Sequence, residues 1–387
     1  MRTCSADVVV VGGGVIGASV AYQLAVRGAG SVVVCEQHWG AGKTATTQSG
    51  GVLRVQHTAD CDIELAARSL PTYRDFCRVV GGYCGYVPCG FALLVGEAQV
   101  GALRLNVEKA RFAGGRIELL EPAQLARRYP GLRLDGVAAV GYEPDGGYGN
   151  PASTARELLL AARAAGARVH AGVRVEALLS RGERITGVRT NLGEITASTV
   201  VLAGGASSAR VAATAGLDLP ITGEPIGIAL SRSAAKTGYH VPAAIDDTLG
   251  NYFRPDGTPG MYFGVSCDAE PAPTWTDHAL RGERIETARA ALQARVPALA
   301  DGQLAGTRVG VDGYTPDRHP LIGPAGPDGL YLATGMSGGG YKIAPAVGEL
   351  AAAQILTGIE QKPLLPYRPQ RFIDGEPIAA EFGYQWM

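Results

Sequence analysis

The first strong pattern in the chain is a run of apolar residues that changes its period within about 30 positions. Val8 to Val11 form a continuous apolar stretch, typical of a strand buried on both faces. After the glycines that follow, apolar residues recur at helical spacing, and a second apolar run from Ser31 to Cys35 predicts another buried strand. This order of strand, glycine turn, helix and strand is typical of a dinucleotide-binding unit.

The glycines of this turn have the spacing that such a unit requires. Gly12, Gly14 and Gly17 stand in GxGxxG register. The first allows a tight turn, the second lets a pyrophosphate approach the backbone, and the third lets the helix pack on the strand. Glu36 ends the second apolar run, where its carboxylate can accept hydrogen bonds from a ribose and disfavours a 2′-phosphate. The sequence therefore predicts a site for FAD or NAD rather than NADP.

Further along the chain, the alternation of strand and helix patterns is interrupted. Ala41 to Arg54 is a loop of small residues, which we expect beside the cofactor, and Cys61 to Val80 has a helical pattern. A strand pair around Tyr83 to Val95 is predicted to begin a second unit. The first unit returns with a helix that Asn150 caps and Pro151 opens.

Two later segments complete this outline. Residues 252–266 (YFRPDGTPGMYFGVS) predict a hairpin in the second unit. Residues 329–356 predict a strand, a glycine turn and an alanine-rich helix that closes the nucleotide-binding unit.

Composition narrows the class of protein. The 387 residues are 46% hydrophobic and 18% charged, enough for a large core and about two domains. A formal net charge of -1 gives no bias toward nucleic acid or an anionic membrane. Since the first strand begins close to Met1 and no apolar run is long enough to span a bilayer, we expect a cytoplasmic protein. Seven cysteines at irregular spacings predict free thiols, without a disulfide scaffold or metal site.

Five motifs follow one another along the chain: the first glycine turn, GAGKTATTQSGGVLR, VVLAGGASS, YTPDRHPLIGP and GLYLATGMSGGGYKIAPAVGEL. In this order they resemble the D-amino-acid oxidase superfamily of FAD enzymes, and most closely its glycine oxidase and monomeric sarcosine oxidase branches. The resemblance covers nearly the whole chain.

The resemblance implies an α/β (α+β) fold of two parts. A Rossmann-like FAD-binding domain would be made of the discontinuous segments 1–80, 141–215 and 308–370. A mixed β-sheet substrate-binding domain, 81–140 and 216–307, would lie over the flavin.

It also implies a reaction. An FAD enzyme of this kind oxidises the C–N bond of a small amino acid, here glycine-like or N-substituted, by hydride-equivalent transfer to flavin N5. The imine is then hydrolysed, and oxygen reoxidises the flavin to give hydrogen peroxide. The FAD site implied by the resemblance consists of Gly12, Gly14, Val15, Ile16, Gly17, Glu36, Gln37, Thr44, Thr47, Gln48, Ser49, Gly50, Gly51, Val175, Ala203, Gly204, Gly310, Gly338, Gly339, Gly340, Tyr341 and Lys342.

Two cations match carboxylate-binding positions of sarcosine oxidases. Arg54 ends the small-residue loop, and its planar fork suits a carboxylate, although it would also suit a nearby acid or the flavin ring. Lys342 follows the glycine turn, where the alternative is a lysine that points to solvent. Glycine oxidases place an arginine upstream of the TPD motif, and this chain has Asp312 there. Asp312 would meet a cationic or hydroxylated part of a larger substrate or serve as a loop residue.

Other positions depart from the sarcosine oxidase pattern. Gly310 replaces the cysteine that tethers FAD, so FAD is expected to bind noncovalently. Tyr262 and Ser266 stand where a lysine that speeds the oxygen reaction and a histidine are found, which puts the oxygen reaction in question. Tyr262 would hydrogen-bond substrate, wall the pocket or pack in the core.

Three more residues are candidates for the pocket. Tyr252 and Arg254 are pocket candidates in the same hairpin, and His57 would touch flavin or substrate or be structural. The missing lysine leaves open an FAD-dependent amino-acid dehydrogenase that passes electrons to a carrier or quinone. A flavin-binding scaffold without activity is a further alternative, under which the pocket cations would have no role.

Overall fold

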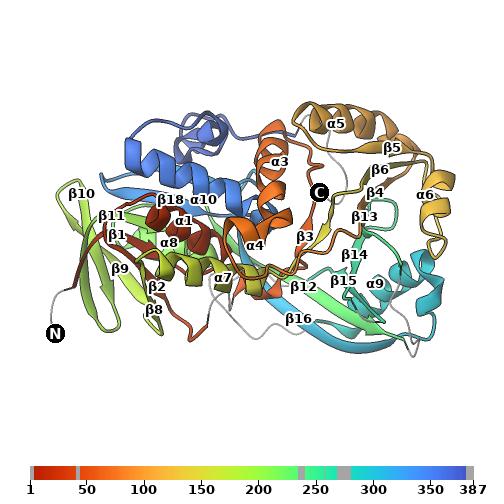
Figure 1. The fold of residues 1–387 in the computed structure, drawn as a ribbon, viewed down its shortest axis with the longest axis horizontal. Helices are drawn as coiled ribbons and strands as arrows, with labels where there is room; N and C mark the ends of the chain where they lie inside the picture. Colours follow the sequence, from red (N-terminus) through yellow and green to blue (C-terminus); the bar gives the residue numbers. More distant parts are fainter. Residues whose placement is uncertain (1–3, 41–43, 234–239, 258, 268–279, 381–387) are drawn as a thin grey trace.

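The structure is a computed structural model, and it places the predicted units in the two halves of an elongated molecule (Figure 1). Each half is built around one eight-stranded sheet. Positions 41–43 of the small-residue loop lie outside the residues that the structure describes. The described residues are 4–40, 44–233, 240–257, 259–267 and 280–380.

The first sheet contains the predicted dinucleotide-binding unit. Its strands are β1 (Cys4–Val11), β2 (Val32–Glu36), β8 (Arg168–Ala171), β9 (Val175–Arg181), β10 (Arg184–Thr190), β11 (Gly193–Leu202), β17 (Leu321–Pro324) and β18 (Leu330–Thr334). They are ordered β17-β18-β11-β1-β2-β8, with β10 and β9 joined to β11. The five strands from β18 to β8 pair in parallel, and the others pair antiparallel.

The valine run of β1 is buried on both faces, as the sequence predicts. Val8 and Val10 pack in a core with the helices that cover one face, whereas Val9 and Val11 pack with β9, β10 and α8 on the other. The helices of the first half are α1 (Val15–Val26), α3 (Asp60–Arg74), α7 (Pro151–Ala164), α8 (Ser208–Ala213) and α10 (Gly340–Thr357). Figure 1 shows α1 and α10 side by side above this sheet, where they pack on each other.

The second sheet is mixed. Its strands are β4 (Phe91–Val95), β5 (Glu118–Leu120), β6 (Ala139–Glu143), β12 (Thr222–Arg232), β13 (Ala243–Asp246), β14 (Asn251–Pro255), β15 (Gly260–Val265) and β16 (Gln303–Tyr314). In the order β16-β12-β15-β14-β13-β4-β6-β5 only the β13–β4 pair is parallel. One face packs on α5 (Val100–Phe112), and the other packs on α6 (Pro122–Arg128) and α9 (Gly282–Arg295).

A two-stranded sheet and several short elements complete the fold. β3 and β7 form a small antiparallel pair that joins the small-residue loop to the segment before α7. The short elements are α2 (Ala45–Gln48), α4 (Phe76–Val79), β3 (Val52–Leu53), β7 (Gly147–Tyr148), η1 (Glu97–Gln99), η2 (Gly205–Ser207), η3 (Pro297–Leu299), η4 (Lys362–Tyr367) and η5 (Pro369–Phe372).

The predicted fold class is confirmed, because a largely parallel sheet with helices and a separate mixed sheet are both present. Each sheet collects strands from distant parts of the chain. The division at 80, 140, 215 and 307 stays a prediction. Two of its boundaries fall inside strands of the second sheet, 140 within β6 and 307 within β16.

Local predictions have mixed outcomes. Asn150 caps α7 by accepting a hydrogen bond from the Ser153 amide at 3.0 Å, and β14 pairs with β15 as the hairpin pattern predicts. The strand pair around Tyr83 to Val95 is wrong, since β4 is the one strand assigned there. Pro88 has no amide to donate, and the preceding Gly85 has a left-handed φ of 71°, so the chain before β4 does not extend as a strand.

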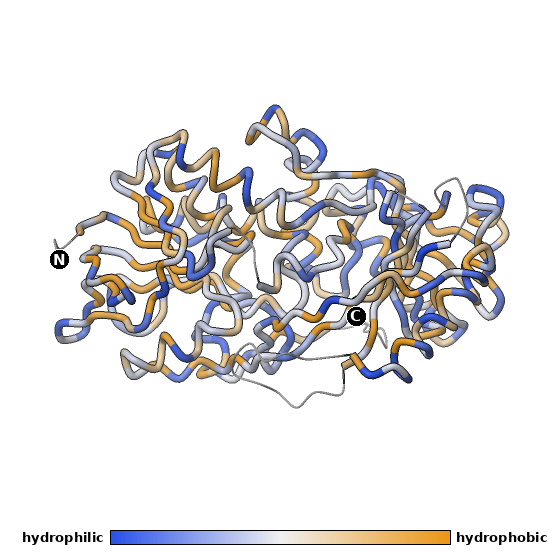
Figure 2. The backbone as a smooth tube through the Cα atoms, turned by 90° about the horizontal axis from the view of Figure 1, so that it is seen from below, coloured by the Kyte–Doolittle hydropathy of each residue, from blue (hydrophilic) through white to orange (hydrophobic). Residues whose placement is uncertain are grey.

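The hydropathy of the chain follows this layout. Hydrophobic stretches run through the interior strands and helices, and hydrophilic stretches gather at outer turns (Figure 2). Among the described residues, no helix is both long enough and apolar enough to cross a membrane.

Candidate active site

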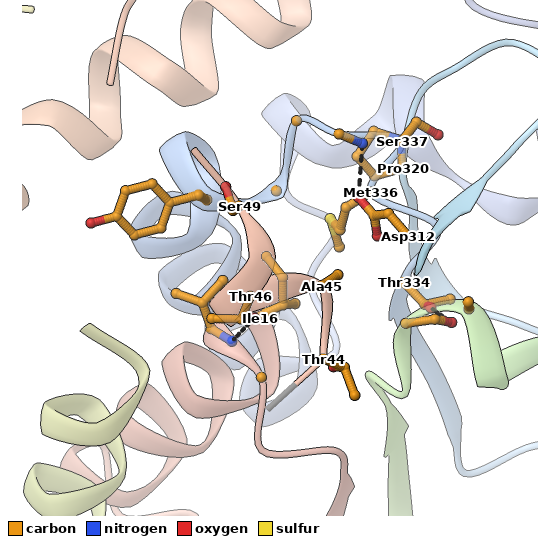
Figure 3. Close-up of a pocket in the computed structure, with 18 of the residues that line it drawn as sticks. Ile16, Thr44, Ala45, Thr46, Ser49, Asp312, Pro320, Thr334, Met336 and Ser337 are labelled. Carbon is orange, nitrogen blue, oxygen red and sulfur yellow. Dashed lines mark hydrogen bonds between the residues drawn. The ribbon is translucent and has the colours of Figure 1, made fainter. Parts of the chain in front are cut away.

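A cavity of about 820 Å³ reaches from the first glycine turn to residues of the second sheet. Figure 3 shows Ala45, Thr46 and Ser49 of α2 and its flank on one side, facing Asp312 and Thr334 across the space. Two groups of residues lie at this cavity. The glycine-turn region is the turn Gly12 to Gly17 together with Glu36, and the charged region is Arg54, His57, Asp62, His319 and Lys342.

The glycine-turn region is shaped by close backbone contacts. Gly12 has a φ of 104°, and a Cβ there would lie 2.5 Å from the carbonyl oxygen of Ala203. A Cβ on Gly17 would overlap the carbonyl oxygen of Gly12. Only glycine fits either position, which agrees with the roles predicted for a tight turn and for helix packing.

Glu36 closes this region. Its Oε2 accepts a hydrogen bond from the Gly13 amide at 2.7 Å, and its Oε1 accepts one from the His38 amide at 2.8 Å. The side chain is 7% exposed and borders the cavity. Since each carboxylate oxygen has a second acceptor site, Glu36 can still accept hydrogen bonds from a ribose.

The start of α1 fits the phosphates of a dinucleotide. The helix has no side-chain cap and no acidic residue in its first turn, and its positive end faces the cavity. Glu36 binds the Gly13 amide just before the helix and leaves the first turn itself without a protein anion. Thr46 Oγ1 accepts from the Val15 amide at 3.1 Å, next to Ile16 in Figure 3. Gln48 Oε1 is buried without a hydrogen-bond partner among the described residues. These groups match a ligand that carries both anionic and donor groups.

Most of the predicted FAD residues line the cavity. Two do not: Gly17 packs against the turn, and Thr47 donates its hydroxyl to the Thr44 carbonyl at 3.0 Å. Those that line it are Gly12, Gly14, Val15, Ile16, Glu36, Gln37, Thr44, Gln48, Ser49, Gly50, Gly51, Val175, Ala203, Gly204, Gly310, Gly338, Gly339, Gly340, Tyr341 and Lys342.

Lys342 lies in the first turn of α10 and is 9% exposed, so it does not point to solvent. Its Nζ donates to the Gly339 carbonyl at 3.4 Å, and the residue borders the cavity. Burial, together with the charge of Arg54, lowers the pKa of Lys342 to about 7. A buried cation of this kind gains most from an anionic ligand.

Arg54 is 8% exposed and lies close enough to Lys342 for their charges to repel. Its guanidinium stands 5.7 Å from the centre of the Phe91 ring and donates to the Gln56 carbonyl. The acid nearby, Glu143, is occupied by the amides of Val55 and Gln56. The cavity therefore brings together two cations from segments almost 290 residues apart.

Asp312 serves the glycine turn before α10. Its Oδ2 accepts from the Gly338 amide at 2.9 Å, and its Oδ1 accepts from the Gly313 amide at 2.8 Å. Figure 3 shows it beside Met336 and Ser337. Burial raises the pKa of Asp312. Both oxygens hold backbone, which favours the loop role of the two that the sequence leaves open.

The hairpin residues divide between the cavity and its surroundings. Tyr252 lines the cavity, and a Cβ on Gly50 would lie 3.0 Å from its ring. Arg254 and Tyr262 are not part of the lining. The Arg254 guanidinium lies between the Tyr148 and Tyr262 rings, 4.3 and 4.4 Å from their centres, and donates to the Gly50 and Pro255 carbonyls. These contacts hold Arg254 behind the small-residue loop.

Sequence reasoning missed Asp62 and His319, which meet in the charged region. His319 Nε2 lies 3.1 Å from Asp62 Oδ2, and its Nδ1 lies 2.6 Å from the Asp317 carbonyl oxygen. Both ring nitrogens thus face acceptors, which favours the imidazolium form. Burial alone would lower the pKa of His319, but the hydrogen bond and charge of Asp62 raise it. His319 belongs to the quoted YTPDRHPLIGP motif, whereas Asp62 has the sequence signal of a helix N-terminus.

Two residues from the C-terminal part of the chain, Tyr367 and Arg371, bind the two aspartates that contact His319. The Tyr367 hydroxyl donates to Asp62 Oδ1 at 2.6 Å. Arg371, which is 0% exposed, binds both oxygens of Asp317 at 2.7 and 2.9 Å. Buried charges of this kind need such partners, so the residues around Asp62 are fixed in place.

Comparison with known proteins gives a consistent set of relatives. The profile of the FAD dependent oxidoreductase family (DAO) matches residues 7–354. The 4-methylaminobutanoate oxidase (formaldehyde-forming) of Paenarthrobacter nicotinovorans is 28% identical over 369 residues, which cover 90% of this chain. They cover 43% of that relative, so the chain spans less than half of its length.

Two solved structures share the fold over almost the whole chain. The L-proline dehydrogenase of P. horikoshii has a TM-score of 0.90 and 26% identity, covering 97% of this chain and all of the other. The glycine oxidase of Geobacillus kaustophilus has a TM-score of 0.82 and 24% identity, covering 95% of this chain and 99% of the other.

Proposed function

The chain belongs to the FAD dependent oxidoreductase family, and from this membership we propose that it oxidises the C–N bond of a small amino acid. The family match confirms the resemblance to D-amino-acid oxidases, and FAD is the cofactor that the family implies. FAD, when bound, supplies the acceptor for the hydride equivalent that leaves the substrate carbon.

The observation that carries the proposal is the pair of buried cations in one cavity. Arg54 and Lys342 come from different segments, both are at most 9% exposed, and both border the space. Two partly desolvated cations would bind a carboxylate strongly and fix its orientation. Held in this way, the substrate keeps one Cα–H bond in a fixed direction, so the two cations would speed the reaction by positioning the substrate.

The substrate class proposed is a glycine-like or N-substituted amino acid. The named relatives act on 4-methylaminobutanoate, proline and glycine, and each of these compounds carries a carboxylate and an amine. Two of the three are secondary amines. We therefore propose N-substituted amino acids as better candidate substrates than glycine.

Noncovalent binding of FAD is part of the proposal. Gly310 borders the cavity, and a Cβ at this position would lie 2.6 Å from the Gln48 Cβ. A tethering side chain would not fit there without displacing Gln48. FAD should then appear in the supernatant after acid precipitation of the holoenzyme, and flavin retained in the protein pellet would contradict this.

Oxygen is the proposed electron acceptor, with hydrogen peroxide as product. The second candidate is a dehydrogenase that passes electrons to a carrier or quinone. It is favoured by the likeness to a proline dehydrogenase and by Tyr262 and Ser266 at the positions where sarcosine oxidases have a lysine and a histidine. A cytoplasmic location is also proposed, supported by seven cysteines that are all free.

The test is anaerobic reduction of the holoenzyme by sarcosine, proline, 4-methylaminobutanoate and glycine, followed by mixing with air. Bleaching of the flavin by at least one of them is expected, with much weaker reduction by dimethylamine, which lacks the carboxylate. Rapid reoxidation with peroxide release supports the oxidase, and slow reoxidation with fast transfer to a quinone supports the dehydrogenase. If none of the amino acids reduces the flavin, the proposed function is wrong.

A further inference from the structure

The proposed reaction, on which this inference rests, requires the amine to lose a proton. Amino acids carry an ammonium group near neutral pH, and its nitrogen has no lone pair to assist loss of hydride from the adjacent carbon. A proton acceptor close to the bound amine would let the enzyme work on this abundant form.

Two carboxylates near the cations are already occupied. Both Asp312 oxygens accept backbone amides, and Asp62 is shared between His319 and the Tyr367 hydroxyl. Lys342 serves as a cation in the proposed carboxylate site. His57 remains among the titratable groups of the charged region.

The surroundings of His57 suit a proton acceptor. It borders the cavity and is 8% exposed, and its Nε2 is buried with no hydrogen-bond partner among the described residues. Its Nδ1 lies 4.0 Å from Asp62 Oδ2. A hydrogen on Nδ1 is favoured by the carboxylate, and this leaves the lone pair on Nε2.

The charged groups around His57 come from four segments. Arg54 precedes it in the chain, Lys342 lies on α10, His319 follows β16, and Asp62 lies on α3. Burial and then the charges of Arg54, Lys342 and His319 hold the pKa of His57 well below its usual value. The ring is therefore neutral in the empty site, with an unused lone pair.

We propose that His57 accepts the proton that the substrate ammonium gives up, and that it does so while a carboxylate neutralises Arg54 and Lys342. One N–H bond of the ammonium breaks, one Nε2–H bond forms, and no electrons leave either partner. The neutral amine and the imidazolium are the products of this step. The imidazolium then faces Asp62 on its other nitrogen.

The carboxylate and the proton transfer are coupled. In the empty site two of the three cations near His57 are Arg54 and Lys342, and a bound carboxylate offsets their charges. The proton affinity of His57 thus rises when a substrate of the right class arrives. An amine without a carboxylate would leave His57 a weak base.

The first experiment measures anaerobic flavin reduction by sarcosine or the best substrate between pH 6.5 and 10 in wild type and His57→Gln. At pH 7 the variant should be about 10²-fold slower. At pH 10, where the substrate amine is already neutral, it should approach the wild-type rate. A loss of the same size at all pH values would overturn the proposal, because a purely structural defect does not depend on whether the substrate amine is protonated.

His170→Gln is the matched control, since His170 lies on β8 and is not part of the cavity lining. It should leave the rate and its pH profile unchanged. His57→Asn is the second variant, for the case in which His57→Gln loses FAD. A holo His57→Asn enzyme with wild-type rates at pH 7 would also overturn the proposal.

The second experiment needs no turnover. Acetate is bound to the holoenzyme at pH 6.5 in two buffers of different ionisation enthalpy, and calorimetry gives the protons taken up. Lys342 is already mostly charged at this pH, so wild type should take up about half a proton or more and His57→Gln far less. Equal uptake in both, or no acetate binding, would overturn the inference. If no amino acid reduces wild type but the uptake differs, the proposed function fails and the coupling of His57 to a carboxylate stands.

Discussion

The glycine-turn region and the charged region border the same cavity but are built in different ways. In the glycine-turn region the contacts involve the backbone of residues that have no side chain. Gly12 packs against the Ala203 carbonyl group, and the Gly13 amide donates a hydrogen bond to Glu36. In the charged region, buried side chains carry opposite charges, as in the Asp62–His319 pair. Backbone contacts tolerate no added atom, whereas the charged contacts depend on pH and on the ligand. Each prediction below tests one side of this difference.

The largest effect is expected from the two cations. If both hold the carboxylate, Arg54→Ala and Lys342→Met should each weaken substrate binding by about 2–5 kcal/mol while FAD content stays near normal. In a double-mutant cycle the losses should not add, since the two groups share one ligand. Binding is measured by titration with sarcosine or acetate.

Lys362→Met is the control for this cycle, because Lys362 is an exposed residue at the start of η4. Its binding should equal that of wild type. Additive losses at Arg54 and Lys342 would show that the two cations act on different partners.

Gly17→Ala tests the backbone side. Its Cβ would overlap the Gly12 carbonyl oxygen, and neither segment can move without opening the turn. We expect loss of FAD binding and a fall of about 3 kcal/mol in the free energy of unfolding, measured in urea. Gly101→Ala on α5 is the control, since nothing lies within 4 Å of its Cβ, and it should be slightly stabilising. An equal response of the two variants would refute the role of close packing at Gly17.

Glu36→Ala removes the acceptor that closes the glycine-turn region. FAD affinity should fall by about 1–3 kcal/mol, because ribose hydroxyls would lose a buried partner and the Gly13 amide would lose its acceptor. Titration of the apoprotein with FAD measures this, with Glu360→Ala at an exposed position as control. Unchanged affinity would mean that Glu36 does not reach the ribose.

The smallest effect is a pH dependence of stability at Lys342. Its pKa is about 7 in the folded protein and near the ordinary 10.5 when unfolded. Between these values the unfolded chain binds more protons at this position, so the free energy of unfolding rises with pH. From pH 7 to 9 the ligand-free wild type should gain about 1–2 kcal/mol relative to Lys342→Met. Parallel curves for the two proteins would show that Lys342 is not desolvated.

The two regions also differ in how far the sequence predicts them. The glycine turn and Glu36 lie within 25 residues of each other, so strand, turn and helix patterns are enough to bring them together. Arg54 and Lys342 were found through the family resemblance, and the cavity contains both. Asp62 and His319 were missed because their contact joins positions 257 apart, which no local period records.

Arg254 and Tyr262 show the opposite limit. Arg254 was a pocket candidate from its place in the hairpin, and Tyr262 was left open between a pocket role and core packing. Neither lines the cavity, and the Arg254 guanidinium lies 4.4 Å from the centre of the Tyr262 ring. Tyr252 and Arg254 share one face of β14, but the Gly50 carbonyl binds Arg254 while Tyr252 reaches the cavity. Which of two residues on the same strand face reaches a ligand depends on the loop packed over it, and this loop is set by tertiary structure.

The centre of the first sheet has a consequence for synthesis of the protein on the ribosome. β1 lies next to β11, and β11 lies next to β18, so neighbours in the sheet begin at positions 4, 193 and 330. A nascent chain that has just left the ribosome tunnel with β1 must wait on the order of tens of seconds for β18. During this time the valine strand is an exposed apolar edge, and chaperones that hold such edges would be needed until translation is almost complete.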